Sequence, residues 1–569
     1  MLKYLATSIV VVLGLAPLVY AGQVHYDLVV GNAVASPDSF ERKRVQLLHA
    51  LICFLTRRVS SVLAGFTSET LQFPGPLITA KRGDIITVNV KNELSSPNMR
   101  ASTSINWSGL LQLGHPEFDG TSFVTQCPIA PNTSFTYTID TGNQAGTFLY
   151  RSGLGIQYVD GLRGPLIIYD PKDPHLHLYD VDDDSTIFQL GEWYHGFSTD
   201  DFNTFQATGS IPIYDAGLIN GVGRMQGGPE VLFGVFNVVS GTRYRLRLIS
   251  NAPRAVFGFF IDQHNLTVIE EDGVSTEPVE VEGLELYPGV STLLTVRYSV
   301  VFAADQPVGN YWLRSFPRGG TQTKNPNCLA IVRYAGAPLE DPTTSQANIT
   351  LLKETQLHPL INPGSPGGPD AEPDVNITLN FTTGATAENP LDTWRINDIS
   401  YKDPSIPTLT QIMNNNDIFP EDSHIIALPP NALVQMVMPL GEDGGGHPMH
   451  IHGTTFDVIQ PGDSGGVKNF ANPSRRDVIP VIGDTTVIRF RTPAVGACEL
   501  NQKHDLTNAC SAGPGKGVFH VHCHIIWHAE AGLQMTLISD PNVVRETVRP
   551  SREWNDLCDK YNSLPAELR

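Results

Sequence analysis

Short β-prone runs separated by turn clusters recur along the whole chain, and they constrain its fold more than any other feature. Runs rich in Val, Ile, Thr, Phe and Tyr include His25–Val30, Asp84–Val90, Ser134–Ile139, Arg243–Ile249 and Thr292–Val300. The sequence holds 51 Gly and 42 Pro residues, whereas charged residues make up only 17% of it. This balance favours turn-rich β-sandwiches over long solvated helices.

Two breaks divide the chain into candidate domains. The first is the turn-rich segment at residues 169–174, and the second is the polar, Pro-rich stretch at 335–373. The length of 569 residues allows several domains. We therefore expect three domains, at residues 22–170, 171–340 and 341–569.

The N-terminus has the pattern of a secretory signal. Met-Leu-Lys precedes an apolar run from Tyr4 to Val19 and a small-residue exit, which predicts a signal peptide at residues 1–21. No later stretch reaches the roughly 18 apolar residues of a membrane span, so we expect no membrane partner and a secreted, extracellular protein. Glycosylation sequons fit a secreted glycoprotein and lie at Asn132, Asn265, Asn348, Asn376 and Asn380.

The net charge of the chain limits the kinds of molecule that it can bind. The formal net charge is −20, so the surface repels phosphate backbones and nucleic acid is excluded as a partner. A neutral or cationic small substrate is compatible with this charge.

Two stretches depart from their surroundings. Lys43–Arg58 is a basic-flanked apolar segment, which we interpret as a buried or partner-binding helix, as an external loop insertion, or as translated non-coding sequence. Val495–Gly513 contains Cys498 and Cys510, which can close a small loop disulfide.

Histidines gather in two short segments near the C-terminus. Seven of the 17 histidines lie there, at positions 447, 450, 452, 520, 522, 524 and 528. In a strand, residues i and i+2 face the same way, so His450 pairs with His452, and His522 pairs with His524. Cys523 must then face the opposite side.

On that opposite side, Cys523 can meet His447 and His528. Two imidazoles and one thiolate form the ligand set of a blue-copper electron-transfer site. Zinc is the competing interpretation, but zinc prefers four firm ligands and the position ten residues after Cys523 is Leu533, which cannot coordinate. The chain has seven cysteines, and because this number is odd, one thiol can have a role other than disulfide formation.

The sequence resembles the fungal-type laccases of the multicopper oxidase family. The motifs that carry this resemblance are the two His-rich segments together with Phe73–Leu77, Asp119–Ile129, Gln157–Gly164, Tyr169–Pro171 and Asn310–Trp312. The resemblance implies an all-β fold of three cupredoxin-like, Greek-key β-sandwich domains. It also implies a monomer that oxidises small phenols, lignin-type aromatics among them, by one-electron transfer to a type-1 copper, with O2 as the terminal acceptor at a cluster of three further coppers.

The resemblance assigns roles position by position. His447, Cys523 and His528 match the type-1 copper ligands, with Leu533 at the axial position. Asp215 matches the carboxylate that accepts a hydrogen bond from the phenol beside an exposed His528. Asp215, His528 and Cys523 are therefore the candidate catalytic residues. The candidate ligands of the cluster coppers are His450 for the type-2 ion and His452, His522 and His524 for the type-3 ions.

The family pattern also implies which cysteines pair. It joins Cys127 to Cys558 near the C-terminus. A second family disulfide is expected to be absent, because Val159 stands at the position of one of its cysteines.

The chain departs from the family at four cluster positions. Where the family has histidines, this sequence has Asn106, Ser108, Arg151 and Gly153. We therefore expect the remaining cluster histidines to hold one extra metal ion at most. Two classes of function stay open: a secreted laccase-type enzyme, and a non-enzymatic one-copper electron carrier or copper-binding pseudo-laccase.

Overall fold

The structure, a computed structural model, describes residues 22–40, 42–53, 71–112, 114–224, 228, 232–286, 297–318, 328–346, 348–385, 391, 393–441, 445–493 and 517–569. The signal-type segment, residues 54–58 and the 495–513 stretch lie outside the described residues. The signal cleavage and the Cys498–Cys510 disulfide therefore stay predictions.

The first part of the chain forms two four-stranded sheets, of strand order β2-β1-β4-β6 and β3-β8-β7-β5. Their strands are β1 (Gln23–Ala35), β2 (Arg42–Cys53), β3 (Ile78–Lys81), β4 (Ile85–Asn92), β5 (Ile105–Ser108), β6 (Ser134–Asp140), β7 (Gly146–Ser152) and β8 (Arg163–Tyr169). Buried and half-exposed residues alternate along β4 and β6, as expected for strands with one face on the core.

The middle part forms a six-stranded sheet, β10-β9-β12-β17-β14-β15, and a five-stranded sheet, β11-β19-β18-β13-β16. Their strands are β9 (Ile187–Trp193), β10 (Ala216–Ile219), β11 (Gly234–Val238), β12 (Arg243–Ser250), β13 (Val256–Ile261), β14 (Leu266–Glu271), β15 (Val274–Val281), β16 (Leu284–Leu286), β17 (Arg297–Ala303), β18 (Asn310–Arg318) and β19 (Cys328–Tyr334). Helix α1 (Ser198–Thr208) follows β9.

The last part forms two five-stranded sheets, β20-β24-β29-β26-β27 and β23-β31-β30-β25-β28, and the hairpin β21-β22. Their strands are β20 (Val375–Thr378), β21 (Phe381–Gly384), β22 (Thr393–Ile396), β23 (Ile425–Leu428), β24 (Leu433–Met438), β25 (His447–Ile451), β26 (Phe456–Gln460), β27 (Arg475–Arg476), β28 (Val478–Val481), β29 (Thr486–Arg491), β30 (Val518–Cys523) and β31 (Gln534–Ser539). The helices of this part are α2 (Thr408–Met413), α3 (Ile526–Glu530), α4 (Pro541–Thr547) and α5 (Arg552–Asn562).

The three parts share one topological plan. In each part, one sheet contains a parallel pair: β1 with β4, β9 with β12, and β20 with β24. The other sheet of each part also ends in a parallel pair: β3 with β8, β11 with β19, and β23 with β31. Most other pairings are antiparallel, as in Greek-key sandwiches. The all-β, three-domain fold class is therefore confirmed, while the boundaries near 170 and 340 stay predictions.

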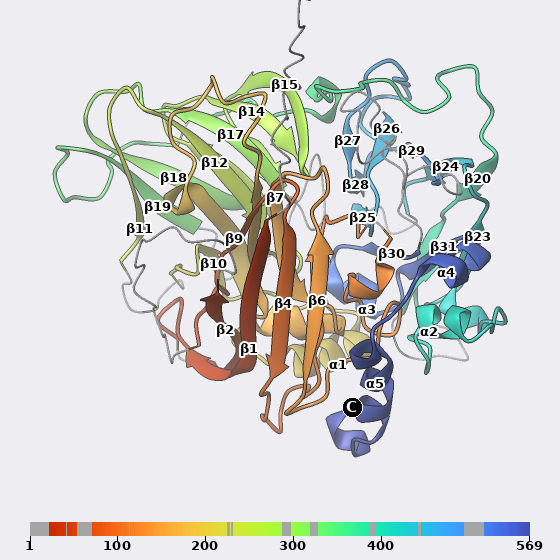
Figure 1. Cartoon of the computed structure of the whole chain (residues 1–569). Coiled ribbons are helices and arrows are strands. Elements are labelled where there is room, and N and C mark those ends of the chain that lie inside the picture. The colour runs from red at the N-terminus through yellow and green to blue at the C-terminus, as the bar shows by residue number, and fades with distance from the viewer. Residues whose placement is uncertain are drawn as a thin grey trace, which may run out of the picture.

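The C-terminal helix packs against the first part of the chain. In Figure 1 the strands of the first part, red to orange, stand between the green middle part and the blue last part, and α5 returns to the end of β6. Trp554 and Leu557 of α5 are buried in the core of the first part, where the Trp554 indole N–H donates to the Thr125 carbonyl at 3.1 Å. The disulfide between Cys127 and Cys558, with Cα atoms 5.0 Å apart, confirms the pairing that the resemblance implies.

One interpretation of the Lys43–Arg58 stretch is wrong over the described part. Arg42–Cys53 is not a helix but the edge strand β2, which pairs antiparallel with β1 from Ala35 to His25. A short apolar run does not by itself distinguish helix from strand, and β1 offers an open hydrogen-bonding edge that an extended segment can satisfy.

Candidate metal centre

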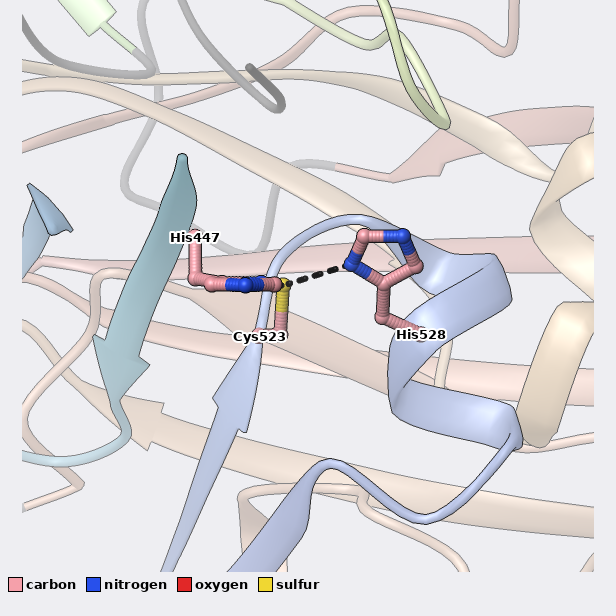
Figure 2. A group of neighbouring side chains, drawn as sticks. All are labelled: His447, Cys523 and His528. Carbon is pink, nitrogen blue, oxygen red and sulfur yellow. Dashed lines mark hydrogen bonds between the residues drawn. The ribbon is translucent and has the colours of Figure 1, made fainter. Parts of the chain in front are cut away.

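Three buried ligand-type side chains converge where β25, β30 and α3 meet. The Cys523 Sγ lies 3.9 Å from Nδ1 of His447 and 3.9 Å from Nδ1 of His528. Figure 2 shows the thiol between the two imidazoles, with His447 on β25, Cys523 at the end of β30 and His528 on α3. Helix α3 begins at Ile526, soon after Cys523, and this turn brings His528 back to the sulfur.

The donor set fits copper better than zinc. One thiolate and two imidazoles with a weak or absent axial ligand suit a blue-copper ion, whereas structural zinc takes four firm ligands. Within the described residues, the group of His, Cys, Asp and Glu ligands at this point contains three members only. The neighbouring Leu533 is fully buried, and its carbonyl accepts from the Cys523 backbone N–H at 3.1 Å, so an apolar side chain lies beside the thiol.

The expectation of an exposed His528 is wrong. The residue is only 2% exposed, and the indole of Trp394 on β22 stacks on its ring with centroids 3.9 Å apart. The same indole meets His447 edge-on at 4.9 Å. Burial, with smaller contributions from His447 and Arg254, lowers the pKa of His528 well below its ordinary value, which favours the neutral form that binds metals.

A second group of imidazoles lies on the other face of β25 and β30. His450, His452 and His522 place one nitrogen each within 4.8 Å of the others, and His450 stands opposite His522 in the strand register. Burial lowers the pKa of His450 and of His522 well below the ordinary value, so both are neutral. His524 is not part of this three-histidine group, and the centroid of its ring lies 5.8 Å from that of His450.

The positions at which the sequence departs from the family's cluster histidines lie on the side of this second imidazole group. The Asn106 amide nitrogen lies 3.4 Å from Nδ1 of His452, and the Arg151 guanidinium lies 3.3 Å from Nε2 of His522. Ser108 donates to the Asn106 amide oxygen at 2.7 Å, and Gly153 contributes no side chain. These residues supply no further imidazole, so the side chains present do not fit a cluster of three copper ions.

Asp215 immediately precedes β10 and is only 4% exposed. Its Oδ2 accepts from the backbone N–H of His195 at 2.8 Å, and its Oδ1 lies 3.6 Å from the His195 ring. The other ring nitrogen of His195 lies 2.8 Å from Asp38, and Phe40 stacks on that ring at 4.7 Å.

Sequence reasoning missed Trp394, His195 and Asp38. Each is a single residue far from the His-rich segments along the chain, and none belongs to a spaced motif. Their closeness to the predicted site residues arises only from the packing of separate strands and loops.

The fold and this geometry define a class of protein: a multidomain cupredoxin with a buried group of two histidines and one cysteine that suits copper. Multicopper oxidase profiles match residues 66–173, 184–337 and 396–543. The chain belongs to the multicopper oxidase family.

Curated relatives place the chain more narrowly among fungal-type laccases. It is 40% identical to laccase-2 of Agaricus bisporus, covering 96% of this chain and 95% of that protein. It is 39% identical to laccase-4 of Trametes villosa, covering 95% and 94%. The crystal structure of the laccase from Botrytis aclada matches with a TM-score of 0.75 at 28% identity, covering 95% of this chain and 93% of that chain.

The protein is thus a laccase-family copper oxidoreductase, and the comparisons do not favour the non-enzymatic electron carrier. Among the described residues, no helix has the length and apolarity needed to span a bilayer.

Proposed function

We propose that His447, Cys523 and His528 hold a type-1 copper through which this chain takes single electrons from phenols. The observation that carries the proposal is the position of the Cys523 sulfur, 3.9 Å from one nitrogen of each imidazole. All three side chains are buried, so water does not compete for the metal.

Copper, when bound there, supplies a one-electron acceptor. Each phenol gives up one electron and one proton and leaves as a phenoxyl radical. Asp215 is the group that accepts the proton of the phenol in this proposal. The His195 backbone N–H donates to one oxygen of this carboxylate and holds the side chain in place, and in this proposal the carboxylate accepts the phenol proton. Trp394, stacked on His528, keeps water away from one face of the imidazole.

The type-1 assignment is tested by the colour of the copper-loaded protein. A copper–thiolate bond gives intense visible absorption, and we expect Cys523→Ser to abolish it. Cys328→Ser is the matched control, because Cys328 is a second buried cysteine with a free thiol, and burial raises its pKa to about 12. A colourless copper-loaded wild-type protein would refute the assignment, as would loss of colour in the Cys328 variant.

The same proposal extends to the setting in which the enzyme works. The enzyme is a secreted, monomeric glycoprotein with three domains divided near residues 170 and 340, and it acts on lignin-type phenols. O2 is the terminal acceptor of its family, although the residues present do not hold the full copper cluster that reduces O2. Asn132, Asn265, Asn348, Asn376 and Asn380 are all exposed and support glycan attachment, whereas the sequon at Asn106 is buried. Glycan mapping of the secreted protein, its N-terminal sequence and its molar mass by light scattering test these points.

A further inference from the structure

The His450, His452 and His522 group has a feature that copper at the type-1 site does not explain: one ring nitrogen from each of three buried imidazoles lies within 4.8 Å of the other two. Each ring has its Nδ1 beside an oxygen that only accepts hydrogen bonds. His450 Nδ1 lies 2.8 Å from the Asp477 carbonyl, His452 Nδ1 lies 3.1 Å from the Asp119 carboxylate, and His522 Nδ1 lies 2.8 Å from the Cys523 carbonyl. An Nδ1–H donor suits each of these acceptors, and a neutral ring with its proton there carries a lone pair on Nε2.

The three Nε2 atoms differ in their hydrogen-bond partners. The His450 Nε2 is buried without a hydrogen-bond partner among the described residues. The Nε2 atoms of His452 and His522 face each other at 3.2 Å, a contact that a proton on one ring or a shared cation can bridge, and the His522 Nε2 also lies 3.3 Å from the Arg151 guanidinium. Metal–nitrogen bonds of about 2.0–2.1 Å put two nitrogens on a tetrahedral ion roughly 3.3 Å apart, so the spacing suits a shared cation.

On the side of the cavity opposite these histidines, neighbouring atoms fill the space that a further ligand side chain would need. A Cβ on Gly153 would lie 2.2 Å from the Gly120 carbonyl oxygen and 2.8 Å from the Ser104 hydroxyl, so no side chain fits there without moving backbone. The Gly153 backbone is also held in place by two hydrogen bonds: its N–H donates to the Ser104 carbonyl at 3.0 Å, and its carbonyl accepts from the Ser122 N–H at 2.9 Å.

Arg151 brings a permanent positive charge to the same cavity. Its guanidinium lies 3.3 Å from the His522 Nε2 and 5.0 Å from the centre of the Tyr158 ring, and the residue is buried. An Arg N–H can only donate, so it occupies the His522 lone pair that a metal would use. It also repels any second cation in the cavity.

We propose that His450, His452 and His522 bind one divalent ion, copper(II) or zinc, as a mononuclear three-imidazole site, and that Arg151 limits this face to that single ion. Imidazole ligands suit both metals, and copper(II) binds more tightly than zinc to a given nitrogen site. The proposal is independent of the type-1 assignment, because it uses none of the type-1 ligands. The absorption of the type-1 site therefore reports separately on that assignment.

The decisive measurement is the metal content of the full-length, copper-loaded protein together with its electron paramagnetic resonance spectrum. We expect two metal ions per chain, with a second copper(II) signal showing imidazole-nitrogen coupling beside the type-1 signal. If zinc fills the site, we expect one zinc and one copper per chain. Four coppers per chain would overturn the proposal, and so would one copper with no second metal.

Variants locate the second ion and test the role of Arg151. We expect His450→Gln to remove the second ion while the type-1 absorption persists, which also shows that the variant is folded. His520→Gln is the matched control: His520 is a buried neighbour with its ring 5.0 Å from that of His522, but it is held by Gln534 at 2.6 Å and lies outside the group. Loss of the second ion from the His520 variant alone would overturn the ligand assignment.

Arg151→Met removes the charge and frees the His522 lone pair at similar side-chain length. We expect the second ion to bind at least tenfold more tightly, as measured by competition with a chelator. Unchanged or weaker binding in a variant that retains its type-1 absorption would show that Arg151 does not restrict the site.

Discussion

The indole of Trp394 lies almost parallel to the imidazole of His528, at an interplanar angle of 21° and with centroids 3.9 Å apart. The two residues come from strand β22 and helix α3, which pack together at the predicted type-1 site. Trp394 therefore covers the imidazole through which the electron of a phenol would enter.

We expect Trp394→Leu to uncover His528 and to speed reduction of the type-1 copper by a small inorganic reductant. Trp394→Phe keeps an aromatic ring and should stay close to the wild type. The Leu variant should also lose about 2 kcal/mol of stability, because it leaves a cavity where the indole was. Stopped-flow reduction rates and thermal melting test this, and equal rates in all three proteins would count against a covering role.

Asp215→Asn should slow reduction of the copper by phenols about a hundredfold, because an amide cannot accept the phenol proton. Reduction by an outer-sphere inorganic complex involves no such proton and should change little. The contrast between the two reductants is the measurement, and equal slowing would mean that Asp215 only supports the local structure.

The Cys127–Cys558 disulfide closes a sequence separation of 431 residues and anchors α5 to the first part of the chain. Cys558→Ser should lower the stability by about 3–5 kcal/mol, because the unfolded chain gains freedom. Differential scanning calorimetry tests the loss, with Cys328→Ser as the control that removes a thiol but no disulfide. A melting temperature equal to that of the wild type would contradict the expectation.

Glu192 should make stability depend on pH. It is fully buried, accepts hydrogen bonds from Tyr194 at 2.6 Å and from Ala255, and burial raises its pKa to about 7. Because the pKa is raised on folding, its contribution is full below about pH 4.5 and is lost as the pH rises through 7, a change of about 3 kcal/mol.

The Glu192→Gln variant cannot ionise and should therefore gain in melting temperature relative to the wild type between pH 4.5 and 7. Exposed Glu546→Gln serves as the control. A constant difference between wild type and E192Q across this range would show that Glu192 does not titrate there.

The sequence determined the fold class and predicted the candidate ligands. Short β-prone runs between Gly- and Pro-rich turns can bury their apolar faces only by pairing into sandwiches, as β4 and β6 do. The alternation of side chains along a strand put Cys523 opposite His522 and His524, and so predicted its meeting with His447 and His528. Both rules act over a few neighbouring residues, so the spacing of residue types in the sequence is enough to apply them.

Tertiary structure decided what surrounds these ligands. The Trp394 ring over His528, the His195 contact with Asp215 and the edge strand β2 each depend on segments that meet only after the sheets have packed. The sequence showed that Gly153 lacks a histidine side chain, but only the packed structure shows that the Gly120 carbonyl fills the space that a side chain would need. Contacts between distant segments follow from the shape of the packed core, which no local pattern of residues records.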